Sequence, residues 1–210
     1  MPGPANTPFS ALEPTEPCFF CKQPSSKLCS GCANARYCSA ACQKKDWKAR
    51  KLVCKAFANQ EPRPTDNYFR AIKFPSGEPA PRFIWVEYKD PNTWISNKTA
   101  PHLGDGFIDH ISHDGCPNHK REHDFRLGIW CRDQYVGDEG RDCAALDKLL
   151  GEKMAMYFCG SFVAHGYEKG GIKFGDEDED GKPVDLDTAV IGTLLRVFKA
   201  QAARPGQVVL

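Results

Sequence analysis

Seven cysteines crowd into the first quarter of the chain, and six of them form close pairs. In order they are Cys18/Cys21, Cys29/Cys32, Cys38/Cys42 and the single Cys54. A Cys-x2-Cys pair on a tight turn directs two sulfurs at one ion, and Zn²⁺ takes four soft ligands in a tetrahedron. Two pairs from separate segments can therefore complete one site. Three pairs in so short a segment indicate metal ligation rather than a set of buried free thiols.

The rest of the composition places these cysteines in a reducing compartment. The N-terminal segment MPGPANTPFSALEPTEP has neither the basic nor the apolar region of a secretory signal. No apolar run approaches the length of a bilayer span. We therefore expect an intracellular protein, in the nucleus or the cytoplasm. In that setting closely spaced cysteines are metal ligands more often than disulfides.

Positive charge accompanies the cysteines. Residues 16–56 hold nine Lys and Arg against two acidic side chains, a formal charge of +7, whereas the whole chain carries +1 and the remainder therefore −6. Seven thiolates and two Zn²⁺ would lower the charge of the segment to about +4. The basic residues thus partly compensate the thiolates, and they give only weak support for nucleic-acid binding.

The segment 18–54 resembles the MYND zinc fingers. The resemblance is carried by Cys18-x2-Cys21, Cys29-x2-Cys32, Tyr37-Cys38-Ser39-x2-Cys42-Gln43, Trp47 and Cys54. It implies a small zinc-stabilised cross-brace finger with two interleaved sites. By resemblance, the first site takes Cys18, Cys21, Cys38 and Cys42. The second takes Cys29, Cys32 and Cys54, together with a histidine three residues after the tryptophan.

In this sequence Arg50 stands where that histidine is expected. A guanidinium stays protonated and offers only donors, so it cannot ligate a metal. Three thiolates could still hold zinc with water or a ligand from elsewhere. We favour a weaker second site, in which Arg50 hydrogen-bonds a thiolate and offsets its charge. The first site is complete, so we expect the module to fold around at least one Zn²⁺.

The resemblance also implies a function. MYND fingers are protein-interaction modules that bind proline-containing peptides in extended form, and the residues corresponding to Gln43 and Trp47 line the peptide groove. A flat indole suits a stiff proline segment, because little conformational entropy is lost on binding. The alternative for Trp47 is packing inside the finger. We expect an adaptor or regulator that recruits a proline-containing partner, and no enzymatic activity.

Two other functions stay open. The basic finger could belong to a nucleic-acid-associated transcriptional regulator. A metal-dependent enzyme could use an open second zinc site or a histidine cluster. The cluster consists of His110, His113, Cys116, His119 and His123. One of these histidines could also supply the fourth ligand of the second site. We expect the segment 109–123 to be an irregular, solvated loop.

Composition divides the chain into a Pro-rich disordered tail (1–15), the finger (16–57), a linker (58–66) and an α+β domain of unknown function (67–210). Apolar alternation and Pro/Gly boundaries predict strands at 68–74, 82–88, 124–131 and 156–163. Helices are predicted at 143–153 and 185–201, the second with Asp187 as N-cap. The whole arrangement resembles fungal proteins that carry an N-terminal MYND finger before a region of unknown function.

Overall fold

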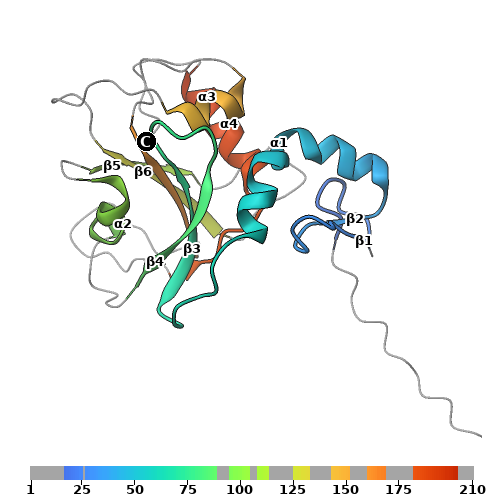
Figure 1. Ribbon diagram of the computed structural model, residues 1–210, viewed down its shortest axis with the longest axis horizontal. Coiled ribbons are helices and arrows are strands. Elements are labelled where there is room, and N and C mark those ends of the chain that lie inside the picture. The colour runs from blue at the N-terminus through green and yellow to red at the C-terminus, as the bar shows by residue number, and fades with distance from the viewer. Residues whose placement is uncertain are drawn as a thin grey trace, which may run out of the picture.

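An antiparallel sheet lies at the centre of the structure, with helices on both of its faces (Figure 1). The computed structural model describes residues 17–25, 27–88, 95–104, 108–113, 125–132, 143–151, 160–168 and 182–202. The strands are β3 (Tyr68–Phe74), β4 (Arg82–Glu87), β5 (Ile108–His113), β6 (Phe125–Arg132), β7 (Phe162–Glu168) and β8 (Pro183–Val184). Within the described residues they form a six-stranded sheet in the order β4-β3-β7-β6-β5, and β8 pairs with β7. Every pairing is antiparallel.

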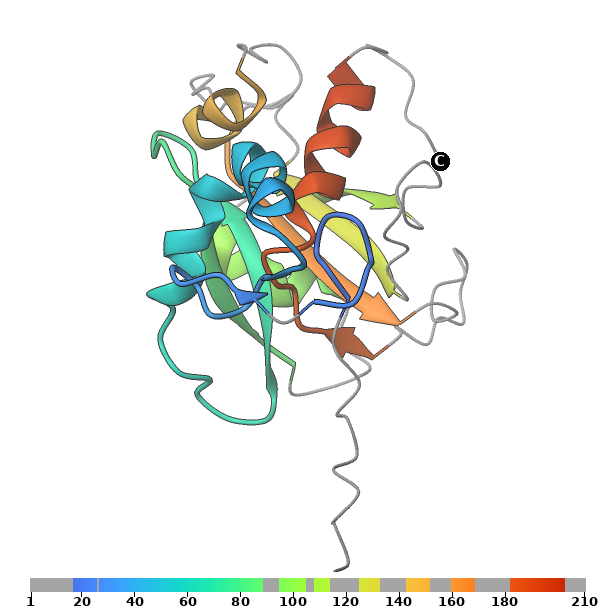
Figure 2. The ribbon, with the colours of Figure 1, turned by 90° about the vertical axis from the view of Figure 1, so that its right-hand side faces the viewer.

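Four helices surround this sheet in the described part of the chain. They are α1 (Ala40–Ala58), α2 (Ile95–Leu103), α3 (Ala144–Leu150) and α4 (Ile191–Ala202). Figure 2 shows α1 and α4 on one side of the sheet, whereas α2 lies on the other side. None of the described helices is long and apolar enough to cross a membrane. A mixed helix-and-sheet region thus follows the cysteine-rich module, as the sequence predicts.

Each face of the sheet buries its own hydrophobic cluster. Successive side chains of a strand point to opposite faces, so β3 sends Ile72 and Phe74 into the larger cluster and Ala71 into the smaller one. Phe198 of α4 packs edge-on against Phe74 and against Phe162, with ring centroids 5.5 and 5.9 Å away. Ile191, Leu194 and Phe198 of α4 are buried in the larger cluster, and Leu195 is partly buried against it.

The predicted strands at 68–74, 82–88 and 124–131 correspond to β3, β4 and β6, and the predicted helix at 143–153 corresponds to α3. Of the strand expected at 156–163, residues 156–159 lie outside the described residues, and the last two residues belong to β7. This strand continues through His165 and Gly166, which are poor strand signals. The expectation of an irregular loop from 109 onward was wrong for its first part, since 108–113 pairs with β6.

The last helix begins later than predicted. Tertiary contacts hold residues 185–187 out of the helix, and residues 188–190 form a turn before it. Leu186 donates its backbone N–H to the carbonyl of Arg70, and Asp185 accepts from the Arg70 backbone N–H at 2.9 Å. Asp187 accepts from the backbone of Ala189 at 2.6 Å, so it caps the turn that leads into α4.

The N-terminal module, residues 17–39 with α1, meets the sheet region through that helix. Val53 is fully buried in the larger core cluster, whereas its neighbour Cys54 is buried among the cysteines. Phe57 touches both clusters and packs edge-on against Phe83 at 5.1 Å. The predicted domain boundaries at 57 and 67 stay a prediction. Helix α1 contributes side chains both to the cysteine cluster of the finger and to the larger cluster of the sheet region.

We expect Val53→Ala to lower the free energy of unfolding by about 2 kcal/mol, because it removes buried methyl groups at the junction of α1 and the sheet. Urea denaturation of metal-saturated protein would measure this. Leu28→Ala is the control, since Leu28 is 47% exposed and should change stability by less than about 0.5 kcal/mol. An equally small effect at Val53 would contradict the packing of α1 into the core.

Candidate metal centre

Four sulfurs gather at one end of α1. The cysteines are Cys18, Cys21, Cys38 and Cys42, and their ligand atoms all lie within 4.8 Å of one another. The Sγ of Cys21 lies 3.4 Å from that of Cys38 and 3.8 Å from that of Cys42, while the sulfurs of Cys38 and Cys42 are 3.5 Å apart. Zinc–sulfur bonds of about 2.3 Å in a tetrahedron place sulfurs about 3.8 Å apart. The four thiols therefore fit one tetrahedral zinc ion.

Local structure explains how the two pairs meet. Lys22 adopts a left-handed conformation, φ +62°, and donates its N–H to the carbonyl of Cys18, which closes a tight turn around the first pair. Ser39 caps α1, because its Oγ accepts from the backbone N–H of Cys42 at 3.2 Å. The cap places Cys38 just before the helix and Cys42 in its first turn.

The four thiols can all ionise together only if a cation lies among them. Burial alone would raise the pKa of Cys18, but backbone hydrogen bonds at Cys21 and Cys38 lower it to about 6. Hydrogen bonds with the thiols of Cys21 and Cys42 raise the pKa of Cys38 to about 12. Four sulfurs this close cannot all carry negative charge alone. A divalent cation among them removes this repulsion.

A second group holds three buried cysteines, Cys29, Cys32 and Cys54, again within 4.8 Å of one another. The Sγ atoms of Cys29 and Cys54 are 3.9 Å apart. A Cβ added at Gly31 would lie 3.1 Å from the sulfur of Cys54, so a small residue suits this close approach. Both ligand groups inferred from the resemblance are therefore assembled, the second with three sulfurs.

Arg50 lies against the second group, as the sequence predicts. Its guanidinium is fully buried and donates to Cys32 Sγ at 3.4 Å and to Cys29 Sγ at 3.6 Å. Its Nε donates to Asp46 Oδ2 at 2.7 Å, and the Tyr37 hydroxyl donates to the same oxygen. The guanidinium thus supplies positive charge beside two sulfurs of the second group.

The charges in this network reinforce one another. Although burial lowers the pKa of Arg50, its hydrogen bond to Asp46 raises it well above the ordinary value. Burial opposes ionisation of Cys29, but backbone hydrogen bonds and Arg50 lower the pKa of this thiol to about 7. Burial, followed by the charges of Cys32 and Cys29, raises the pKa of Cys54 to about 11. One thiolate of this group is therefore stabilised by Arg50 without any metal.

Asp46 and its role were missed by sequence reasoning. The available signal was its spacing from Arg50, because an acid and an arginine at i and i+4 lie on the same side of a helix. The carboxylate is 22% exposed and the guanidinium is fully buried. Asp46 is thus the counter-ion that makes a buried arginine tolerable next to the cysteines.

We expect Asp46→Asn to lower the free energy of unfolding by about 3 kcal/mol, because it leaves the buried guanidinium without its negative partner. Thermal or urea denaturation would measure this, with Asp66→Asn as the matched control at an exposed position. If both variants lose the same small amount, Asp46 does not support Arg50.

Trp47 lies on the surface rather than inside the finger, with 44% of it exposed. It lines an open groove of about 380 Å³ together with Gln43, Lys44 and Ala40 from α1 and Cys29, Ser30 and Gly31 from the loop beneath. Gln43 and Trp47 are four residues apart, so they share one face of the helix. The Arg50 guanidinium lies 5.6 Å from the Trp47 ring, over its face.

The structure does not describe the side chains of the histidine cluster, so their position relative to the metal centre is not given. His110 and His113 belong to β5, but their side chains lie outside the described residues, as do Cys116, His119 and His123. Whether one of these histidines completes the second site therefore stays a prediction. The metal-binding groups among the described residues consist of cysteines alone.

These features define a class of protein: a small cysteine-rich metal-binding finger, with two interleaved ligand groups, joined to an α+β region. The family model of the MYND finger matches residues 18–54, which hold all seven cysteines. Residues 18–54 are therefore a MYND-type zinc finger. MYND fingers are in general protein-interaction modules.

Curated relatives share this segment with the chain. Ubiquitin carboxyl-terminal hydrolase 19 of Arabidopsis thaliana is 47% identical over 51 residues, 24% of this chain and 8% of that protein. Tudor domain-containing protein 1 of Oryzias latipes is 40% identical over 63 residues, 27% of this chain and 6% of that protein. Protein CBFA2T2 of Homo sapiens is 48% identical over 42 residues, 20% of this chain and 7% of that protein.

The chain thus spans less than a tenth of the length of these relatives. No solved structure matches the chain.

Proposed function

We propose that this protein is a zinc-dependent adaptor whose MYND finger binds a proline-containing segment of another protein. The observation that carries the proposal is the exposed indole of Trp47 in a groove shared with Gln43. The proposal assigns no reaction to the chain. Thiols that must stay reduced to hold metal suit a protein of the nucleus or the cytoplasm.

The groove has the chemistry that an extended proline segment needs. A polyproline II segment has no internal hydrogen bonds and little entropy to lose, so a flat aromatic surface and one or two polar groups are enough to hold it. Trp47 offers the aromatic face, and the Gln43 amide can donate to and accept from a peptide backbone. The Arg50 guanidinium lies over the ring, 5.6 Å from its centroid, and a contact of this kind favours a preformed surface.

Zinc is the metal that we assign to the finger. Cys18, Cys21, Cys38 and Cys42 would hold a structural ion in a closed tetrahedron, and this ion would supply most of the folding free energy of so short a segment. Cys29, Cys32 and Cys54 would hold a second ion more weakly. The Arg50 guanidinium already donates to two of these sulfurs, and its charge opposes that of Zn²⁺.

We expect about one zinc per chain to remain after passage over a chelating resin, and about two in Arg50→His, because a neutral imidazole is a ligand and a guanidinium is not. Elemental analysis would count the ions. Lys51→His is the control, since Lys51 is exposed on α1 and should leave the zinc content unchanged. Two tightly held ions in the original protein would contradict the weak second site.

We expect Trp47→Ala to weaken the binding of proline-containing peptides about tenfold or more, because an aromatic anchor in a groove carries much of the binding energy. Fluorescence anisotropy with a pool of labelled peptides, each holding two prolines, would measure this in the full chain. Gln43→Ala should have a smaller effect in the same direction. Phe20→Ala is the matched control, because Phe20 is 40% exposed and lies outside the groove. Unchanged affinity in Trp47→Ala would refute the peptide site.

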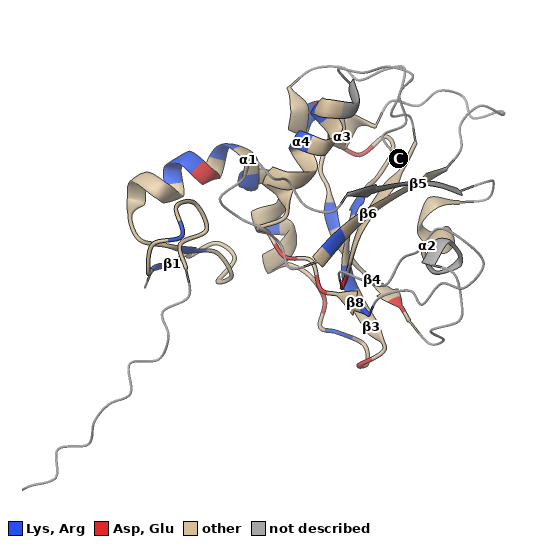
Figure 3. Cartoon of the chain, turned by 180° about the vertical axis from the view of Figure 1, so that it is seen from behind, with Lys and Arg blue, Asp and Glu red and all other residues tan. Residues whose placement is uncertain are grey.

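One observation favours a second candidate, a nucleic-acid-associated regulator. The exposed surface of α1 carries Lys44, Lys45, Lys48, Lys51 and Lys55 (Figure 3). Contacts with phosphates release counter-ions, so retention on DNA would fall steeply as salt rises. If the protein is retained on DNA at physiological salt, and if Lys→Glu changes at these positions abolish this retention, the result would favour the regulator over the adaptor.

A further inference from the structure

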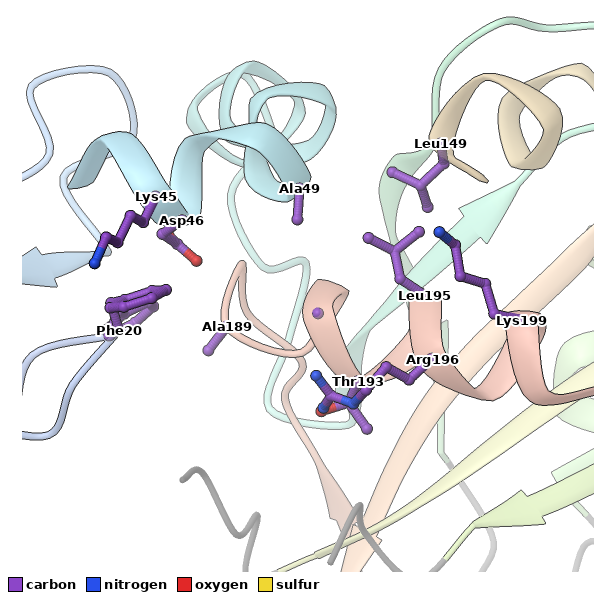
Figure 4. Close-up of a pocket in the computed structure, with 12 residues that line it drawn as sticks. Phe20, Lys45, Asp46, Ala49, Leu149, Ala189, Thr193, Leu195, Arg196 and Lys199 are labelled. Carbon is purple, nitrogen blue, oxygen red and sulfur yellow. The ribbon is translucent and has the colours of Figure 1, made fainter. Parts of the chain in front are cut away.

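A cleft opens where the finger meets α3 and α4 (Figure 4). Its volume is about 300 Å³. Phe20 and Lys45 line it from the finger, and Leu149 and Leu195 line it from the two helices. The residues that line this cleft do not include any that line the Trp47 groove. The cleft is therefore a separate surface, formed only because α1 holds the finger against the α+β region.

Cations stand on both walls of the cleft. Lys45 comes from α1, while Arg196 and Lys199 come from α4. Neither Lys45 nor Lys199 forms an ion pair with a carboxylate of the described residues. The carboxylate in the lining belongs to Asp46, which is already engaged by Arg50 and the Tyr37 hydroxyl. Lys45 and Lys199 thus have no carboxylate partner among the described residues, and the Lys45 ammonium lies over the Phe20 ring, 5.6 Å from its centroid.

The floor between these cations is apolar. Phe20 is 40% exposed, and Leu149 and Leu195 are partly buried against the core. Ala49 and Ala189 leave space between them because their side chains are small. In Figure 4 the leucines face one another at one end of the cleft and Phe20 lies at the other. An apolar side chain of a ligand could be removed from water here.

We propose that this cleft binds an acidic peptide segment of a partner protein, with a central pair of apolar side chains between flanking Asp or Glu residues. One apolar side chain packs on Leu149 and Leu195, and the other packs toward Phe20 at the opposite end of the cleft. The flanking carboxylates reach the ammonium groups of Lys45 and Lys199 on opposite walls. Arg196 lies on the α4 wall with Lys199, and its Nη2 donates to Thr193 Oγ1 at 3.1 Å, which positions the guanidinium.

The lining favours a peptide over a nucleic acid. A nucleic-acid strand presents evenly spaced phosphates and flat bases, so it needs a continuous row of cations and aromatic platforms. Here leucine and alanine side chains separate the cations. Among the described residues that line the cleft, Phe20 is the exposed aromatic residue. Carboxylates on both sides of an apolar side chain match this pattern of charge and apolar surface.

The two binding surfaces lie on different sides of α1. Lys44 lines the Trp47 groove, and the next residue, Lys45, lines the cleft. Successive residues of a helix point in directions about 100° apart, so neighbouring lysines serve different surfaces. The acidic-peptide site therefore does not rest on the proline-segment site, and either can fail without the other.

Fluorescence anisotropy on the full, zinc-loaded chain would test the site. The probe is a short fluorescein-labelled peptide of Asp and Glu with a central Leu-Phe pair. We expect the double variant Lys45→Glu with Lys199→Glu to weaken binding about tenfold. The matched control, Lys48→Glu with Lys51→Glu, changes the net charge equally on exposed residues of α1 outside the cleft, and should change affinity less than about twofold.

Three further measurements complete the test. Phe20→Ala should weaken the peptide without a change of charge, and Trp47→Ala should leave it unchanged. A peptide with Ser-Ser in place of Leu-Phe should bind more weakly. If both double variants lose the same affinity for the peptide, the binding is general electrostatic attraction and the proposed site is wrong. Equal affinity for the Ser-Ser peptide, or tighter binding of a single-stranded oligonucleotide with the same dependence on Lys45 and Lys199, would also overturn it.

Discussion

The N-terminal module depends on one buried guanidinium, which contacts the second cysteine group, an acidic side chain and two aromatic rings. Arg50 contacts two cysteine sulfurs, the Asp46 carboxylate and two aromatic rings, those of Tyr37 and Trp47. Burying a charge is costly unless partners surround it, and here every side of the guanidinium has one. The same side chain therefore supports the second cysteine group and the indole of the proposed peptide groove. Arginine is suited to this position because its planar fork can address several acceptors at once.

The helix that carries Arg50 also determines how the two halves of the chain meet. The N-terminal part of α1 supplies a cysteine ligand and the groove residues, and its C-terminal part packs on the sheet through Val53 and Phe57. A polar contact adds to this junction, because the Thr188 hydroxyl donates to Asn34 Oδ1 at 2.7 Å. The finger and the α+β region thus form surfaces together that neither would have alone.

Sequence reasoning succeeded where the signal is local. The resemblance to MYND fingers implied both ligand groups, and the protonated guanidinium of Arg50 predicted its contact with a sulfur. Alternation of apolar residues predicted β3 and β4. The remaining features depend on tertiary contacts or on weak signals. Strand β7 runs through His165 and Gly166, which favour strands poorly, and its neighbours on the sheet supply the pairing.

The packing of α1 on the sheet was also missed. Its signal is the helical spacing of Ala49, Val53, Ala56 and Phe57, all of which contact the larger core cluster. Lysines lie between these residues in the sequence, so the apolar periodicity of the helix is weak. Nothing in the local sequence indicates that a cleft forms against α4, because the residues of its two walls lie a hundred or more positions apart in the chain. Such surfaces become visible only when the fold is known.

The adjacency of Val53 and Cys54 couples metal and fold by thermodynamic linkage. A ligand that binds only the native state adds its binding free energy to the stability of every residue that unfolds with it. Because one turn of α1 belongs to both clusters, loss of the metal would loosen the edge of the sheet core as well as the finger. The stability of the whole protein would then vary with the free concentration of the ion, including that of the α+β region, which provides no ligand among the described residues.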